Sequence, residues 1–209
     1  MTELKVEYDL VAIIDCLPEK QRDKYKITSR LMNFLASKGI KQKAIYCASK
    51  KEVFDAFQYL NNLADKSKFC LHVVAHGNKN GIGIVDTREL ISWEEFNQHL
   101  LTINEKLSNS LIVNMTSCKG LYSITANNES QNNYPFFGLI GCNRNLKVSE
   151  GKIANELFYS KLIEGKNISA IVPEIQSEFK RLGKPDNVIY SISSEGYNKI
   201  KNHIENNNA

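Results

Sequence analysis

Short apolar runs alternate along the chain with segments in which apolar residues recur every three or four positions. The runs are typical of strands buried on both faces of a sheet, and they predict six strands, over residues 10–15, 43–48, 69–76, 110–115, 136–142 and 187–193. Helical spacing predicts helices over residues 22–37, 50–63, 92–107, 149–164 and 169–182, and a last helix after the sixth strand. This alternation indicates an α/β fold, with a mostly parallel six-stranded sheet and helices on both faces.

Capping residues at the helix ends support these boundaries. Gly39 is expected to close the first helix as a C-terminal cap. Ser49 with Glu52, and Ser92 with Glu95, form capping boxes whose side chains satisfy free amides at a helix start. The buried stripe of the second helix is expected to consist of Phe54, Phe57, Leu60 and Leu63.

Two segments depart from the alternation. Residues 78–81 are a turn signal followed by the short apolar segment 82–85, which predicts a small hairpin beside His76. Residues 125–134 have the polar composition of a surface loop.

Composition narrows the class of protein. The 209 residues, 42% of them hydrophobic, favour a single domain over residues 1–209. The net charge of +4 is spread in short clusters without a basic stripe interleaved with aromatic residues, so we expect no nucleic-acid partner. No apolar stretch reaches the ~18 residues of a membrane span, and the first residues lack a signal-peptide pattern. Five cysteines without paired spacing indicate a reduced, cytoplasmic protein.

Candidate chemistry lies at two strand ends. One apolar strand stops at His76-Gly77, and another stops at a Thr-Ser-Cys-Lys-Gly segment that carries Cys118. In an open α/β sheet, reactive groups gather just past the carboxyl ends of the strands. Because a cysteine needs a base to become an efficient nucleophile, and histidine is the usual one, this pattern predicts a cysteine hydrolase.

These two motifs, with the downstream segments 137–142 and 154–166, resemble the caspase-like cysteine peptidases, and their pattern is most similar to that of the bacterial CHAT peptidases. The segment 154–166 has the Phe-Tyr pair and the Leu-x-x-Gly end of the CHAT pattern. True caspases carry Gln-Ala before the nucleophile, where this chain has Thr116 and Ser117.

The resemblance implies a three-layer, caspase-like (flavodoxin-like) fold and a cysteine endopeptidase that cleaves protein or peptide substrates. It also implies regulated intracellular proteolysis, as in bacterial antiviral defence or cell death, with an activating protein partner and a homodimer through the last strand. Residues 121–143 contain no Lys or Arg. An enzyme that prefers basic residues could not cut itself there, and we expect a single-chain enzyme that is switched on by a partner or by ordering of this loop.

Each catalytic candidate has a proposed role. Cys118 is the nucleophile, His76 is the base toward the thiol and the acid toward the leaving amine, and the amides of Gly77 and Cys118 stabilise the oxyanion. The alternative is that Cys118 is an inert buried thiol. Cys16 and Cys142 also lie at strand ends, but neither is followed by Gly.

We expect neither a metal nor a cofactor. Cys70 and His76 alternate onto one strand face with His72, but strand residues rise ~3.3 Å each, so the outer two stand roughly 20 Å apart and cannot share a zinc ion. No glycine-rich phosphate loop follows the first strand, which argues against a flavodoxin-like ligand-binding domain.

Two charged residues are candidates for substrate binding. A carboxylate at Asp15 would favour a basic substrate side chain, although Asp15 could instead cap the following loop. Arg144 would favour an acidic side chain, and an Arg144–Asp15 pair would favour an apolar one. The alternative to an enzyme is a catalytically inactive caspase-like module that binds a partner protein.

Overall fold

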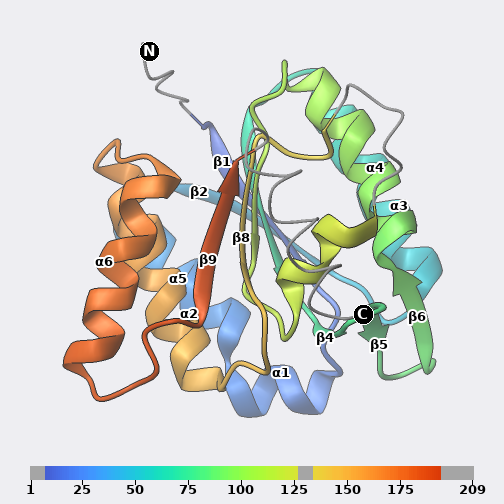
Figure 1. Ribbon diagram of the computed structural model, residues 1–209. Coiled ribbons are helices and arrows are strands. Elements are labelled where there is room, and N and C mark those ends of the chain that lie inside the picture. The colour runs from blue at the N-terminus through green and yellow to red at the C-terminus, as the bar shows by residue number, and fades with distance from the viewer. Residues whose placement is uncertain (1–7, 127–133, 194–209) are drawn as a thin grey trace.

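The computed structural model describes residues 8–126 and 134–193, and it contains two sheets (Figure 1). The larger sheet has six strands in the order β2-β1-β3-β7-β8-β9, and the smaller has the order β4-β5-β6. The larger sheet consists of β1 (Leu10–Asp15), β2 (Lys41–Tyr46), β3 (Phe69–Val74), β7 (Ile112–Met115), β8 (Gly138–Cys142) and β9 (Ile189–Ser193). Its strands are parallel except for β9, which pairs antiparallel with β8, so the predicted mostly parallel six-stranded sheet is confirmed.

Six α-helices accompany the sheet in the described residues: α1 (Glu19–Tyr25), α2 (Ile27–Ser37), α3 (Lys50–Leu63), α4 (Trp93–Lys106), α5 (Val148–Ile163) and α6 (Ile168–Arg181). A 3-10 helix, η1 (Gly120–Ala126), follows β7. Helices α3 and α4 cover one face of the sheet, whereas α2, α5 and α6 cover the other (Figure 1). The layers are therefore helix, sheet and helix, as the alternating pattern predicts.

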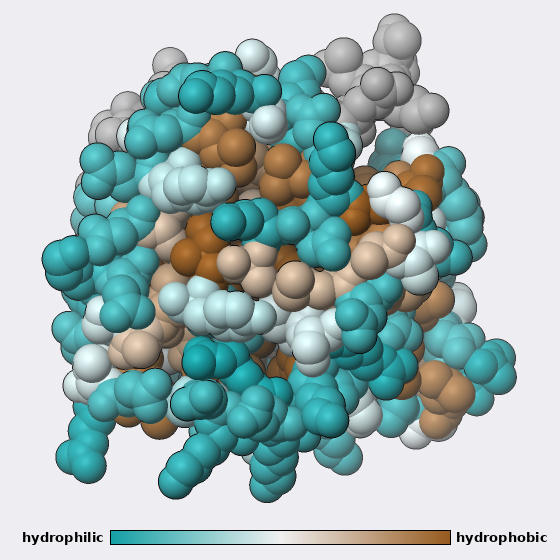
Figure 2. Space-filling model, turned by 180° about the vertical axis from the view of Figure 1, so that it is seen from behind, coloured by the Kyte–Doolittle hydropathy of each residue, from teal (hydrophilic) through white to brown (hydrophobic). Residues whose placement is uncertain are grey.

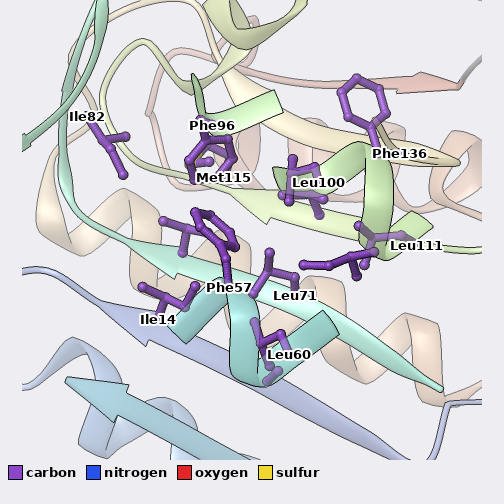
Figure 3. Close-up of a cluster of buried hydrophobic side chains, with 14 of the residues drawn as sticks. Ile14, Phe57, Leu60, Leu71, Ile82, Phe96, Leu100, Leu111, Met115 and Phe136 are labelled. Atoms are coloured by element: carbon purple, nitrogen blue, oxygen red, sulfur yellow. The ribbon is translucent and has the colours of Figure 1, made fainter. Parts of the chain in front are cut away.

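The core between the sheet and helices α3 and α4 is built from large aliphatic and aromatic side chains. Phe57 and Leu60 of α3 pack over Ile14 and Leu71 of the central strands (Figure 3). Phe57 meets Phe96 of α4 edge to face, with 5.2 Å between ring centroids. In the predicted stripe of α3, Phe57 and Leu60 are fully buried, while Phe54 and Leu63 lie at the rim and are only partly buried.

A second core fills the opposite face of the sheet. Ile13 and Ile140 project from the strands and meet Phe158 of α5 and Phe179 of α6, all of which are buried. Because both faces of the central strands are covered, these strands are apolar at consecutive positions, and this is why they stand out in the sequence.

The helix predicted over 22–37 is wrong as a single element. The chain instead forms two helices, because Lys26 between them adopts a left-handed conformation with φ of 50°. That conformation is uncommon for a residue with a Cβ, and no glycine marks it in the sequence.

Several strand boundaries also differ from the prediction. The third strand ends at Val74 rather than at His76, which is the first residue of β4 (His76–Asn78) in the smaller sheet. Strand β4 pairs antiparallel with β5 (Gly81–Ile84), and β5 pairs with β6 (Glu89–Ser92). The predicted hairpin beside His76 is thus confirmed, with a third strand added to it.

Of the two predicted capping boxes, the one at α4 is complete and the one at α3 is only half formed. Ser92 accepts a hydrogen bond from the Glu95 amide while Glu95 accepts one from the Ser92 amide, which completes the capping box of α4. At α3 the Ser49 hydroxyl accepts from the Glu52 amide, but Glu52 accepts from the Ala48 amide instead. The predicted helix after the last strand, and most of the loop predicted over 125–134, lie outside the described residues.

Hydrophilic residues cover most of the molecular face seen in Figure 2, with hydrophobic residues grouped toward its middle. No helix in the described segments is both long and apolar enough to cross a membrane.

Candidate active site

Three segments meet at the carboxyl ends of the central strands. They are the link from β3 into β4, the turn 116–120 after β7, and the loop 143–147 after β8. Strand β7 lies between β3 and β8 in the sheet, with His72 opposite Asn114 and Met115 opposite Gly141. The parallel register therefore brings together segments that are far apart in the sequence.

Gly77 and Cys118 lie directly against each other. A Cβ added at Gly77 would stand 2.1 Å from the carbonyl oxygen of Cys118, closer than any real Cβ contact. Only glycine fits this approach without a shift of the backbone. The structure thus brings the His-Gly motif and the cysteine turn into contact, as expected from their positions at two strand ends.

Ser117 joins the turn 116–120, which we call the cysteine turn, to the end of β3 through two hydrogen bonds. Its hydroxyl donates to the Val73 carbonyl over 3.3 Å and accepts from the Ala75 amide over 3.2 Å. An alanine at this position, as in the caspase motif, could make neither bond. The departure from that motif therefore has a structural role in joining the two segments.

The turn holds Cys118 against the loop 143–147. Lys119 adopts a left-handed conformation with φ of 58°, and its amide donates to the Arg144 carbonyl over 3.1 Å. A Cβ at Gly120 would lie 2.2 Å from the Met115 carbonyl oxygen, so the chain folds back tightly on the strand. The Sγ of Cys118 accepts a hydrogen bond from the Leu146 amide over 3.3 Å.

Cys118 is the one cysteine of the five that is not buried. Burial raises the pKa of the Cys47 and Cys70 thiols to about 12, and it also raises the pKa of Cys16 and Cys142. A thiol with a raised pKa forms little of the nucleophilic thiolate. Accessibility therefore distinguishes Cys118 from the two alternatives at strand ends, Cys16 and Cys142.

The His76 side chain is exposed and has a partner that sequence analysis missed. Its Nε2 lies 2.6 Å from Oε1 of Gln21, on helix α1. Because a carboxamide oxygen only accepts, this bond places the proton on Nε2 and leaves Nδ1 of the neutral ring as the basic nitrogen. Among the described residues, the ring bonds to Gln21 and makes no hydrogen bond to Cys118 Sγ.

Asp15 lies at the end of β1 with only 1% of its surface exposed. One carboxylate oxygen accepts from the Leu17 amide over 2.9 Å, and the other accepts from the Thr28 hydroxyl over 2.6 Å. Burial raises the pKa of this carboxyl group, and the bonds from Thr28 and Leu17 partly offset that increase. The geometry is that of a residue that caps the following loop.

Arg144 lies in the loop that contacts the cysteine turn, and its side chain is 35% exposed. The guanidinium donates to the Asn145 carbonyl over 2.7 Å and faces the carboxylate of Glu150 at 3.4 Å. Arg144 is therefore paired with Glu150, and the neutralising pair with Asp15 that the sequence allowed does not form.

His72 is fully buried in mid-strand. Its Nδ1 lies 3.2 Å from the Tyr159 hydroxyl, and burial lowers its pKa to about 3. The part of the chain that the structure describes holds no group of three His, Cys, Asp or Glu side chains able to bind a metal ion.

Comparison with known protein families and with curated proteins finds no match to this chain.

Proposed function

We propose that the chain is a caspase-like cysteine endopeptidase with Cys118 as nucleophile and His76 as general acid and base. The observation that carries the proposal is the contact between the Gly77 backbone and Cys118, the one cysteine that is not buried. The six-stranded sheet, the three-stranded sheet that begins at His76 and the strand-end location of the site all fit this class.

The proposed reaction proceeds through a thioester. His76 accepts the thiol proton, and the Cys118 sulfur attacks the carbonyl carbon of the scissile peptide bond to form a tetrahedral oxyanion. His76 then donates that proton to the amine as the carbon–nitrogen bond breaks. Water, deprotonated by His76, hydrolyses the thioester and restores the thiol. Backbone amides of Gly77 and Cys118 are the candidate donors to the oxyanion.

The Gln21 bond prepares His76 for this role. With Nε2–H held by Gln21, the basic Nδ1 remains available for the thiol proton. Catalytic hydrogen bonds are often long or misaligned in the absence of substrate. The proposal therefore requires the His76 ring to align with Cys118 when a peptide binds.

The resemblance supports a wider role in regulated proteolysis inside the cell, in bacterial antiviral defence or cell death. An activating partner and a homodimer through β9, which lies at an edge of the larger sheet, belong to the same proposal. The alternative is an inactive binding module, which the lack of a direct His76–Cys118 bond would suit.

Cleavage of a peptide library by the purified chain tests the proposal. We expect hydrolysis that is lost in Cys118→Ala and His76→Ala but retained in Cys47→Ala, which removes a buried thiol. Circular dichroism would confirm that each variant is folded. Equal cleavage by Cys118→Ala and wild type would contradict the proposal, and binding of a partner without any cleavage would favour the inactive module.

A further inference from the structure

Cys142, the last residue of β8, lies against the backbone of the cysteine turn. Its Sγ is 2.9 Å from the Ser117 carbonyl oxygen and 3.2 Å from the Arg144 carbonyl oxygen. The Ser117 carbonyl belongs to the peptide bond that ends at the nitrogen of Cys118. A buried thiol therefore lies one peptide unit away from the backbone of the proposed nucleophile.

The residues on either side of Cys142 also contact this turn. A Cβ added at Gly141 would lie 3.2 Å from the carbonyl carbon of Gly120, which is a tight contact. After Cys142, the Arg144 carbonyl accepts a hydrogen bond from the Lys119 amide over 3.1 Å. These contacts hold the end of β8 and the cysteine turn side by side.

Leu146 provides a second link between the two thiols. Its amide donates to Cys118 Sγ over 3.3 Å, and its side chain packs against the buried cluster that contains Cys142. Burial raises the pKa of Cys142, the Gly120 amide partly offsets this increase, and a negative charge on Cys118 adds to it. The two thiols are therefore close enough to interact.

Of the five cysteines, only Cys118 is accessible to a dissolved oxidant, because the other four are buried. Oxidation of a thiol depends on its exposure and on its thiolate character. Cys16 and Cys47 also lie close enough to interact electrostatically, but both of them are buried. The pair of Cys118 and Cys142 thus combines an accessible thiol with a buried neighbour.

We propose that Cys118 and Cys142 form a reversible oxidation site, in which a peroxide oxidises Cys118 and Cys142 then closes a disulfide with it. The inference goes beyond the proposed peptidase function, since the disulfide needs only the accessible thiol and its neighbour. If the chain is a peptidase, the disulfide switches it off, because the bond consumes the nucleophile.

The oxidation takes two steps. First, the Cys118 thiolate attacks one oxygen of hydrogen peroxide, the O–O bond breaks, hydroxide leaves and a sulfenic acid forms. Second, the Cys142 thiolate attacks the sulfur of that sulfenic acid, so that the S–S bond forms, the S–O bond breaks and a second hydroxide leaves. Each hydroxide takes up the proton that one thiol released. Two thiols and one hydrogen peroxide therefore give one disulfide and two water molecules.

The disulfide also protects the accessible sulfur. A sulfenic acid that meets no second thiol is oxidised further to sulfinic and sulfonic acid, which ordinary thiol reductants do not reverse. To form the bond, Cys118 Sγ exchanges the Leu146 amide for the sulfur of Cys142. Loss of Cys142 should therefore convert a reversible oxidation into an irreversible one.

Peptide mapping without reduction, after treatment of the whole chain with hydrogen peroxide, tests this inference. Lys119 lies between the two cysteines in the sequence, so trypsin leaves them on separate peptides that only a disulfide keeps joined. We expect the intact chain to lose the mass of two hydrogen atoms and the joined peptides to appear. Dithiothreitol should restore both thiols and, with them, any peptidase activity that peroxide removed.

Two variants separate the role of Cys142 from general oxidation. In Cys142→Ala, peroxide should convert Cys118 to sulfinic and sulfonic acid, and dithiothreitol should not restore the activity. Cys47→Ala is the matched control, because it removes a thiol that is also buried but belongs to the other pair. It should form the same disulfide as wild type and recover in the same way. Thermal unfolding checks both variants, and the mapping of the wild type tests the inference even if Cys142→Ala is unstable.

Sulfinic or sulfonic acid on Cys118 of the wild type, with Cys142 still a free thiol, would overturn the inference. A disulfide between other cysteines, or between Cys118 residues of two chains, would also overturn it. If the chain cleaves no peptide but forms the bond between Cys118 and Cys142, the inference is supported while the peptidase proposal fails.

Discussion

The close approach of Gly77 to Cys118 makes position 77 the most sensitive residue of the site. In Gly77→Ala the added methyl group would stand 2.1 Å from the Cys118 carbonyl, so the two segments must separate. We expect peptidase activity to decrease by about 100-fold, because small misplacements of a catalytic group are costly. Overpacking should also cost roughly 1–3 kcal/mol of stability.

Gly83→Ala is the matched control. It lies in the neighbouring strand β5, and a Cβ there would meet nothing within 4 Å. This variant should keep wild-type activity and melting temperature. Equal activity of Gly77→Ala and Gly83→Ala would show that the contact does not matter for the reaction.

The hydrogen bond between Gln21 and His76 should affect the pH dependence of kcat/KM. In Gln21→Glu a carboxylate replaces the amide 2.6 Å from His76 Nε2 and favours the protonated ring. The base is then neutral only at higher pH, so the acid limb of the kcat/KM profile should move to higher pH. Gln21→Ala should lower kcat by about 10-fold without that shift, because the ring loses its orientation. Identical profiles for all three proteins would mean that Gln21 does not act on His76.

His72 links folding to pH. Burial lowers its pKa to about 3 in the folded chain, whereas the unfolded chain titrates near ~6.5. Between these values the unfolded state binds more protons, so the contribution of His72 to stability is complete above pH ~6.5 and is lost as pH falls toward 3. Urea unfolding at pH 6 and pH 4 should show a smaller loss of stability in His72→Gln than in wild type. An equal loss in both would contradict the buried neutral ring.

At the scale of the elements, helix α5 holds the end of β7 that leads to the cysteine. Asn155 Oδ1 accepts from the Thr116 hydroxyl over 2.9 Å and from the Asn114 amide group over 3.2 Å. Asn155→Ala would leave both donors without this acceptor in a buried region, and we expect a loss of about 2–3 kcal/mol in the free energy of unfolding.

Glu156 is the neighbouring control on the same helix. It pairs with Arg30 at the surface, where the two side chains are 31% and 54% exposed. Glu156→Ala should cost less than about 1 kcal/mol, as expected for an exposed ion pair. Similar losses for the two variants in chemical denaturation would argue against a special role of Asn155.

The elements also show what sequence patterns can and cannot predict. Strands such as β1 and β3 were recognisable because both of their faces are buried, so the apolar run is continuous. The break between helices α1 and α2 at Lys26 could not be recognised, because a lysine does not indicate a left-handed backbone conformation. The end of β3 was misplaced for a similar reason, since only pairing with β5 separates His76 from the strand before it.

The candidate site was predictable to the extent that it depends on strand ends. His76, Gly77 and Cys118 could be placed at one sheet edge because parallel strands end together. The hydrogen-bond partner of His76 could not be predicted, because Gln21 lies on a short helix whose packing no local pattern specifies. The burial of Asp15 likewise depends on Thr28 in another helix.

In the whole molecule, the larger sheet is covered on both faces, and the candidate site lies at the carboxyl ends of its strands. Helices cover both faces of the larger sheet, which leaves the carboxyl ends of the strands as the place where loops meet. There Cys118 and His76 lie on different segments that backbone contacts hold together. The fold therefore brings together a site from distant parts of the sequence.

The most direct test of the central claim is peptide mapping after treatment with a substoichiometric peptidyl acyloxymethyl ketone. We expect a single adduct on Cys118, formed quickly in wild type and much more slowly in His76→Ala, with the four buried cysteines unmodified. An adduct on another cysteine, or labelling of Cys118 at the same rate with and without His76, would contradict it.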